Sequence, residues 1–185
     1  MLKIVTVPNK ILSSSTRKVE KIDDKMKKLL IDMEKILRAQ NDPKGVGLSA
    51  NQVGVDLSIF IIKPSEKAKI KVFINPRILK SKIQNPNVKS NPKSKKSVKH
   101  PVKLEGCLSI PRIWGPIKRA KKILLEYQDL TQGVKREWFQ GFEATVIQHE
   151  IDHLNGVVFT QKSLEQNQPI YEEKDGQLEK VTEVS

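Results

Sequence analysis

Residues 22–40 carry apolar side chains at every third or fourth position, from Met26 to Leu37. This spacing places the apolar side chains on one face of a helix. Asp23 or Asp24 can cap the start, because an aspartate oxygen there accepts a hydrogen bond from a free backbone N–H. The pattern therefore predicts an amphipathic helix.

A second helical pattern covers residues 142–154, where apolar side chains again recur at helical spacing. Asn155 and Gly156 follow this stretch. Glycine is the usual residue just past the C-terminus of a helix. We therefore predict a second helix that ends at residue 154.

Short runs of β-branched and aromatic residues predict strands between and around these helices. The predicted strands are residues 1–8, 58–62, 71–75, 122–127, 134–139 and 157–159. Turn residues, including Gly133, link two of these strands and predict a hairpin. Residues 45–52, which contain two glycines, are predicted to form a loop.

Two segments are polar. Residues 80–103 contain eight lysines and no acidic residue, together with three X-Pro pairs. We predict a mobile, solvated insertion there. Clustered lysines also attract phosphate, but the segment has no aromatic residue for stacking on bases. The tail from residue 163 is predicted to form at most a small hairpin.

Composition narrows the class of protein. The formal net charge is +13, and removing the eight lysines of the insertion leaves +5, so the basic character belongs mainly to one segment. The 185 residues suffice for one domain with a buried core. No apolar run approaches the roughly 18 residues of a membrane span, and no signal peptide is evident. A single cysteine cannot form an internal disulfide, which favours the cytoplasm.

The chemistry begins with residues 148–153, which read QHEIDH. On a helix, His149 and His153 lie on one face one turn apart, so both imidazoles can reach one metal ion. Glu150 projects about 100° around the helix from His149, where it can reach a metal-bound water. This HExxH arrangement is typical of metal-dependent hydrolysis.

A catalytic site of this kind needs a third protein ligand. The candidates are Cys107, His100 and carboxylates downstream of the motif. A thiolate is a strong ligand for borderline divalent metals, whereas His100 lies in the lysine-rich insertion. A lone cysteine is, however, often a buried hydrophobic residue. Residue types and spacing alone leave this choice open.

Three motifs together resemble a known family. Residues 45–52 (GVGLSANQ), 105–109 (EGCLS) and 148–153 (QHEIDH) stand in the order of the three motifs of the peptide deformylases. These hydrolases remove the N-formyl group from newly made polypeptides. The resemblance implies an α+β fold in which antiparallel strands pack around a central helix that carries the histidines.

The resemblance also implies the ligands and the metal. Cys107, His149 and His153 would bind one divalent ion. In this family the ion is usually Fe²⁺, and Zn²⁺, Ni²⁺ or Co²⁺ can replace it. The implied substrates are N-formyl-methionyl nascent polypeptides. We expect a cytoplasmic monomer without a membrane anchor.

The remaining site residues follow from the same resemblance. Glu150 would take a proton from the attacking water and deliver it to the departing amine. The Gln52 side-chain amide and the Leu108 backbone N–H would donate hydrogen bonds to the oxyanion.

Other positions would bind the substrate or support the site. Val46 and Val146 would line a slot for the methionine side chain, and Gly47 would let the peptide backbone approach closely. Glu105 and Arg119 are expected to form an ion pair that steadies the cysteine loop.

The sequence departs from the family pattern in three places. Ser49 stands where alanine is usual and adds a hydroxyl near the site. The insertion at residues 80–103 is long for the family. The tail lacks the long basic helix that some bacterial members use at the ribosome, so we hypothesise that the lysine-rich insertion contacts the ribosome instead.

The sequence leaves three alternatives open. A zinc endopeptidase shares the HExxH motif, although its third ligand follows the helix. A basic nucleic-acid-binding module with a structural metal is disfavoured, because structural zinc sites usually have four protein ligands. An inactive relative is disfavoured, because all three ligands, Gln52 and Glu150 are present.

Overall fold

The computed structural model describes residues 2–41, 44–82, 103–131 and 133–182. Most of the predicted lysine-rich insertion therefore lies outside the described residues. The described elements are η1 (Lys10–Ser13), α1 (Asp24–Ala39), β1 (Gly47–Ser49), η2 (Ala50–Val53), β2 (Ile59–Ile62), β3 (Lys71–Lys82), β4 (Leu104–Cys107), β5 (Ile110–Pro116), β6 (Lys122–Gln128), β7 (Val134–Gln140), α2 (Gly141–Leu154), α3 (Phe159–Glu165), β8 (Tyr171–Lys174) and β9 (Gln177–Lys180).

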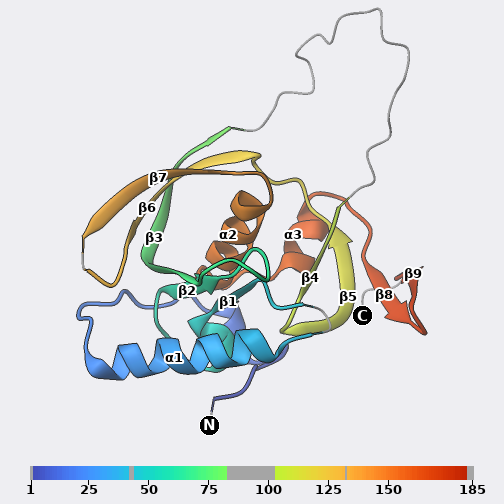
Figure 1. Ribbon diagram of the computed structural model, residues 1–185. Helices are drawn as coiled ribbons and strands as arrows, with labels where there is room; N and C mark the ends of the chain where they lie inside the picture. Colours follow the sequence, from blue (N-terminus) through green and yellow to red (C-terminus); the bar gives the residue numbers. More distant parts are fainter. Residues whose placement is uncertain (1, 42–43, 83–102, 132, 183–185) are drawn as a thin grey trace, which may run out of the picture.

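The strands form two antiparallel sheets. The larger sheet has the order β1-β2-β3-β6-β7, and the smaller one has the order β4-β5-β8-β9. Helix α2 packs on the larger sheet, and α3 packs on β4 and β5 of the smaller one (Figure 1). The predicted α+β fold with a central helix is confirmed.

Strand β2 is the centre of the core, because its two faces meet different helices. Phe60 and Ile62 lie in the cluster that includes residues of α2, and Ile59 and Ile61 lie in the cluster that includes residues of α1. All four side chains are buried. Burying a side chain of this size contributes about 1.5–3 kcal/mol. The sheet is therefore fixed between α1 and α2 at this end.

Both predicted helices are present. Asp23 caps α1, where its Oδ1 accepts a 2.9 Å hydrogen bond from the Met26 backbone N–H. Helix α2 ends at Leu154, and Gly156 follows with a φ of 72°. A Cβ on Gly156 would lie 2.8 Å from the backbone of residues 13–14, so both conformation and space require glycine there.

Three of the predicted elements near the site are wrong. Residues 157–159 form no strand, because Phe159 begins α3 and is buried against the smaller sheet. Residues 45–52 are not wholly a loop, since they contribute strand β1 and most of η2. Residues 2–8 form no strand, because Val5 and Val7 make single backbone bonds to two different segments.

The boundaries of the insertion and the tail also change. Strand β3 continues through residues 80–82, which pair with β6, so the predicted insertion begins later than residue 80. The predicted tail from residue 163 begins inside α3, and the expected hairpin is formed by β8 and β9. In the part of the chain that the structure describes, no helix combines the length and apolar content needed to cross a membrane.

Candidate metal and catalytic site

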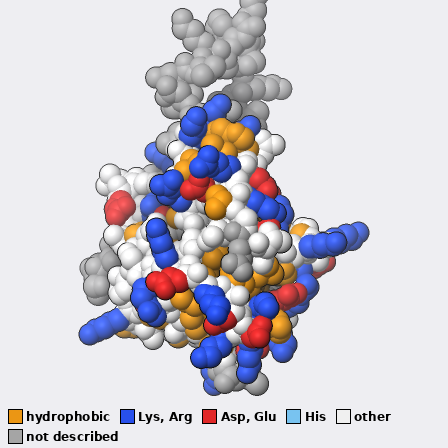
Figure 2. All heavy atoms as spheres, turned by 90° about the vertical axis from the view of Figure 1, so that its left-hand side faces the viewer, with side chains coloured by type: hydrophobic (Ala, Val, Ile, Leu, Met, Phe, Trp, Pro, Cys, Tyr) orange, Lys and Arg blue, Asp and Glu red, His pale blue; other side chains and the backbone are white. Residues whose placement is uncertain are grey.

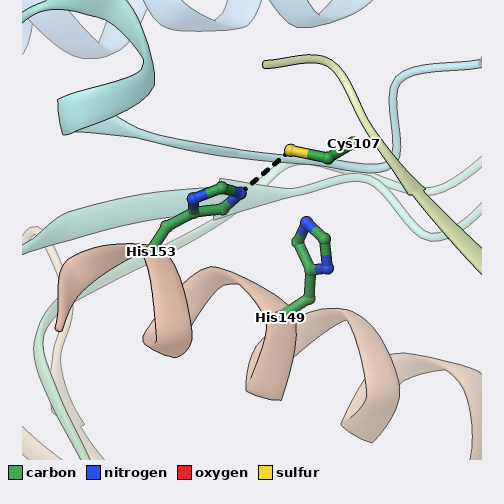
Figure 3. Close-up of side chains that lie close together, drawn as sticks. All are labelled: Cys107, His149 and His153. Atoms are coloured by element: carbon green, nitrogen blue, oxygen red, sulfur yellow. Dashed lines mark hydrogen bonds between the residues drawn. The ribbon is translucent and has the colours of Figure 1, made fainter. Parts of the chain in front are cut away.

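Three side chains that can bind a metal meet between α2 and the end of β4. Figure 3 shows the rings of His149 and His153 projecting from α2 toward Cys107. One ligand atom from each residue lies within 4.8 Å of the other two. The Cys107 Sγ is 3.1 Å from the His153 Nε2. The structure therefore brings together the two histidines of the motif and the upstream cysteine.

This donor set fits a divalent ion. A thiolate and two imidazoles bind zinc and related metals at about 2.0–2.3 Å, so the ligand atoms must converge within a few ångströms of one another. The two imidazoles lie in different electrostatic surroundings. Burial opposes protonation of His149, but hydrogen bonds with Cys107 and Glu105 outweigh burial and raise its pKa to about 10. Burial lowers the pKa of His153, which keeps that imidazole neutral.

A chain of ion pairs extends from the His149 ring. The His149 Nδ1 lies 3.1 Å from the Glu105 Oε2. Arg119 donates to both Glu105 oxygens, at 2.7 and 2.8 Å, and to the Asp152 Oδ2 at 2.6 Å. Lys162 also contacts Asp152. The expected pair of Glu105 and Arg119 is confirmed, whereas the role of Asp152 was not predicted.

This network is almost free of solvent, since the Arg119 side chain is 5% exposed. Burial opposes ionisation of Glu105, but hydrogen bonds from Arg119 and His149 outweigh burial and lower its pKa to about 2. Glu105 therefore stays ionised at neutral pH. A carboxylate that contacts the second nitrogen of a metal-binding histidine fixes the ring orientation.

Glu150 is buried beside the same cluster. Burial raises its pKa to about 7, so the carboxyl group can both accept and release a proton near neutral pH. Gly47 makes room for this side chain. A Cβ at position 47 would lie 2.3 Å from the Glu150 Oε1 and 2.9 Å from the Val146 Cγ1. Glycine at position 47 is therefore a condition for the buried glutamate.

The Gln52 side chain has a fixed orientation. Its Oε1 accepts hydrogen bonds from the Ser49 backbone N–H and hydroxyl, both at 3.0 Å. Its Nε2 donates to the Ser109 Oγ at 3.2 Å and lies 3.4 Å from the Cys107 Sγ. The amide NH₂ therefore points toward the cluster. Sequence reasoning missed Ser109, although it follows the cysteine within the second motif.

A cleft of about 1300 Å³ opens over these residues. Among the predicted site residues its walls include Val46, Gly47, Gln52, Cys107, Leu108, Val146, His149 and Glu150. His153 is the predicted site residue outside this wall, and it is buried. Trp114, Ile117 and Phe142 also line the cleft. No local motif marks these three residues, because separate elements bring them together.

Comparisons with known proteins agree with this geometry. Residues 1–168 match the family model for polypeptide deformylase. The chain is 37% identical over 167 residues to a peptide deformylase of Dictyoglomus turgidum, covering 90% of this chain and 95% of that one. A peptide deformylase structure from Thermotoga maritima is 31% identical with a TM-score of 0.69, covering 88% and 97% of the two chains. One from Plasmodium falciparum is 33% identical with a TM-score of 0.70, covering 87% and 86%.

The fold and the three candidate metal ligands are those of a metal-dependent hydrolase. The chain belongs to the polypeptide deformylase family. It is a hydrolase of protein biosynthesis that removes the N-formyl group from nascent polypeptides. The endopeptidase and the nucleic-acid module with a structural metal are thereby set aside as descriptions of its activity.

Proposed function

We propose that Cys107, His149 and His153 hold the metal ion that deformylation requires. The convergence of these three ligands beside a buried Glu150 is the observation that carries this proposal. We further propose Fe²⁺ as the physiological ion, with Zn²⁺, Ni²⁺ or Co²⁺ able to replace it. A mixed thiolate and imidazole site accepts several first-row metals, so availability decides among them.

Glu150 is proposed to move the proton. A divalent ion supplies Lewis-acid chemistry, because it lowers the pKa of water and polarises a carbonyl oxygen. Glu150 accepts a proton from the attacking water at one carboxylate oxygen and later delivers it to the departing amine. Its raised pKa, about 7, suits both steps. Its Oε2 has no hydrogen-bond partner among the described residues, so that oxygen is free to take the proton.

Gln52 and Leu108 are proposed to stabilise the oxyanion. The Gln52 Nε2 faces the cluster because Ser49 holds the opposite end of the amide. The backbone N–H of Leu108, directly after Cys107, would be the second donor. Donors that are fixed before the reaction stabilise the developing charge without reorganisation.

The substrate is proposed to lie in the cleft as an extended chain. Val46 and Val146 line the cleft beside Glu150 and would contact the methionine side chain. Gly47 lies on strand β1, at the edge of the larger sheet, where a peptide can pair with backbone groups. Backbone pairing leaves the residues after methionine loosely read, as a general processing enzyme needs.

An assay of formate release tests these roles. The protein is loaded anaerobically with Fe²⁺ or Ni²⁺ and given a formyl-Met-Ala-Ser peptide. We expect formate from the wild type, none after chelation, and recovery when the metal is returned. A Cys107→Ala variant that keeps full activity and full metal content would contradict the proposed ligand set.

The cellular setting is proposed from the activity. We place the enzyme in the cytoplasm as a monomer, where its single cysteine would stay reduced. We also propose that residues 1–185 form one domain and that the lysine-rich insertion contacts the ribosome. Deletion of residues 84–100 should weaken co-sedimentation with ribosomes at low salt. Unchanged co-sedimentation would exclude that contact.

A further inference from the structure

The outer face of the larger sheet is apolar at one end and basic at the other. At the β1–β2 end, α1 packs against the sheet. At the other end, where β3, β6 and β7 pair, the inner residues Ile123 and Leu125 are buried toward α2. Their neighbours Lys122 and Leu124 must point the opposite way, because successive side chains of a strand alternate.

Cross-strand pairing assembles the outward side chains into one patch. Lys82 pairs with Lys122, Lys80 pairs with Leu124, and Leu124 pairs with Trp138. We call this patch the basic face, and it consists of Lys80, Lys82, Lys122, Leu124 and Trp138. Figure 2 looks at this side of the molecule, where Lys and Arg side chains surround a hydrophobic area.

Trp138 is the centre of the basic face. It is 42% exposed, although tryptophan is among the most costly side chains to leave in water. The Lys122 Nζ lies 4.9 Å from its ring centroid, and the Lys82 Nζ lies 5.5 Å from it. Two ammonium groups therefore approach one aromatic ring.

The positive charge of this face is not compensated locally. Among the described residues, no carboxylate forms an ion pair with Lys80, Lys82 or Lys122. The nearby Arg77 and Arg136 share the single carboxylate of Glu126. Like charges on directly opposite strand positions destabilise a sheet. The arrangement thus costs stability and suits a ligand that brings negative charge.

An exposed aromatic ring among unpaired lysines matches the chemistry of a single-stranded nucleic acid. Bases stack on aromatic side chains, and the phosphates between them bind ammonium groups. An anionic membrane would need a larger apolar protrusion than one indole and one half-buried leucine. The established substrates are polypeptides leaving an RNA-rich assembly, which favours RNA over DNA.

We propose that the basic face binds single-stranded RNA, with one base stacked on Trp138 and phosphates at Lys80, Lys82 and Lys122. The lysines and the aromatic ring thus come from β3, β6 and β7, which are neighbours in one sheet. The face also adjoins the cleft, because Lys122 pairs with Gln140, which lines the cleft wall. RNA bound there would hold the enzyme beside its emerging substrate.

Fluorescence anisotropy with a labelled 12-nucleotide single-stranded RNA of mixed sequence tests the proposal. We expect Trp138→Leu to weaken binding about tenfold, because stacking on the indole is lost, and Trp138→Phe to restore part of it. The double variant Lys82→Gln/Lys122→Gln should make the negative slope of log affinity against log salt shallower by about 1.4, which is about 0.7 for each lost phosphate contact.

A matched control removes the same charge elsewhere. Lys25 and Lys28 are exposed on α1, so Lys25→Gln/Lys28→Gln should change the salt slope far less than the sheet variant. Formate release should stay unchanged in the sheet variants, which shows that they fold and separates this proposal from the catalytic one.

Three results would overturn the proposal. One is no RNA binding by the wild type in 50 mM salt. Another is equal RNA affinity in the wild type, Trp138→Leu and the double lysine variant. The third is loss of binding to phosphatidylglycerol vesicles in these variants while RNA affinity is kept, which would assign the face to a membrane surface.

Discussion

Helices α1 and α2 flank the same sheet but bury different kinds of side chain. Helix α1 buries five apolar residues and faces solvent with charged ones. Helix α2 buries Ala144, Val146 and Ile147, but on the next turns it also buries Glu150 and His153. The first helix buries apolar side chains alone, whereas the second also buries ionisable side chains in its second half.

The difference shows where this fold buries polar groups at a cost in stability. Three buried side-chain atoms among the described residues lack a hydrogen-bond partner, and two of them, the Glu150 Oε2 and the His153 Nδ1, belong to α2. A buried polar atom that lacks a partner costs about 1–3 kcal/mol. Arg119, Glu105 and the apolar contacts of β2 must therefore hold α2 in place. A variant of a buried polar residue of α2 should therefore lower activity, whereas a variant of a buried apolar residue of α1 should lower stability alone.

The largest effect should come from Glu150→Gln. Without the proposed proton acceptor, formate release should fall about 10²–10⁴-fold. The free energy of unfolding should not fall, because burial already disfavours the charged carboxylate. Steady-state kinetics and urea unfolding measure the two quantities. Glu143→Gln, in the first turn of α2, is the matched control, and a Glu150→Gln enzyme with more than a tenth of wild-type activity would refute this role.

Arg119→Met should reduce stability and activity together. The change leaves Glu105 and Asp152 buried without their cation, which should cost about 3–5 kcal/mol of unfolding free energy. Arg119→Lys should not restore the loss, because lysine lacks the planar fork that binds both carboxylates. The matched change in α1 is Arg38→Met, which breaks an exposed pair with Glu34 and should cost at most about 1 kcal/mol. An equal loss of unfolding free energy in Arg119→Met and Arg38→Met would contradict the contrast between the buried ion-pair network and the exposed pair on α1.

Met33→Ala should affect stability alone. Met33 is completely buried between α1 and the sheet, so truncation should cost about 2–5 kcal/mol. The activity per folded molecule should stay within about twofold of the wild type, because α1 contributes no group to the cleft. Ile31→Ala, on the exposed side of the same helix, serves as the control. A large fall in kcat for folded Met33→Ala would show that α1 positions the site.

Ser49→Ala should give the smallest effect. Gln52 would lose the hydroxyl and keep the backbone N–H as a donor to its Oε1. One neutral hydrogen bond is worth about 1 kcal/mol, so kcat should fall about fivefold with little change in KM. Ser65→Ala, at an exposed position, should leave kcat unchanged. A rise in KM with constant kcat would mean that Ser49 contacts substrate rather than orienting Gln52.

The sequence pattern correctly predicted the helices, because local spacing of apolar residues determines them. Residues 22–40 and 142–154 were predicted as helices, and α1 and α2 begin and end within two residues of those bounds. The periodic apolar residues, Asp23 and Gly156 carry enough local information for this. Residues 157–159 were mistaken for a strand because valines favour strands. Tertiary packing of Phe159 and Ser163 against the smaller sheet decides the matter instead.

The site residues also divide into those that local spacing predicts and those that only the fold brings together. The helical repeat explains why His149 and His153 share a face, and the resemblance to a family identified Cys107 as the third ligand candidate. The contacts of Ser109 and Asp152 follow from distances across 57 and 33 residues of sequence, which no local pattern encodes. Trp138 is recognised as part of the basic face only from the strand register, which places Lys82 and Lys122 beside its ring.

The central claim is that one cysteine and the two histidines of α2 bind the same ion. X-ray absorption spectroscopy of the zinc-loaded protein tests it most directly. We predict one sulfur at about 2.3 Å and two imidazole nitrogens at about 2.0–2.1 Å, with the sulfur lost in Cys107→Ala. A spectrum of the wild type that contains no sulfur ligand would contradict the account.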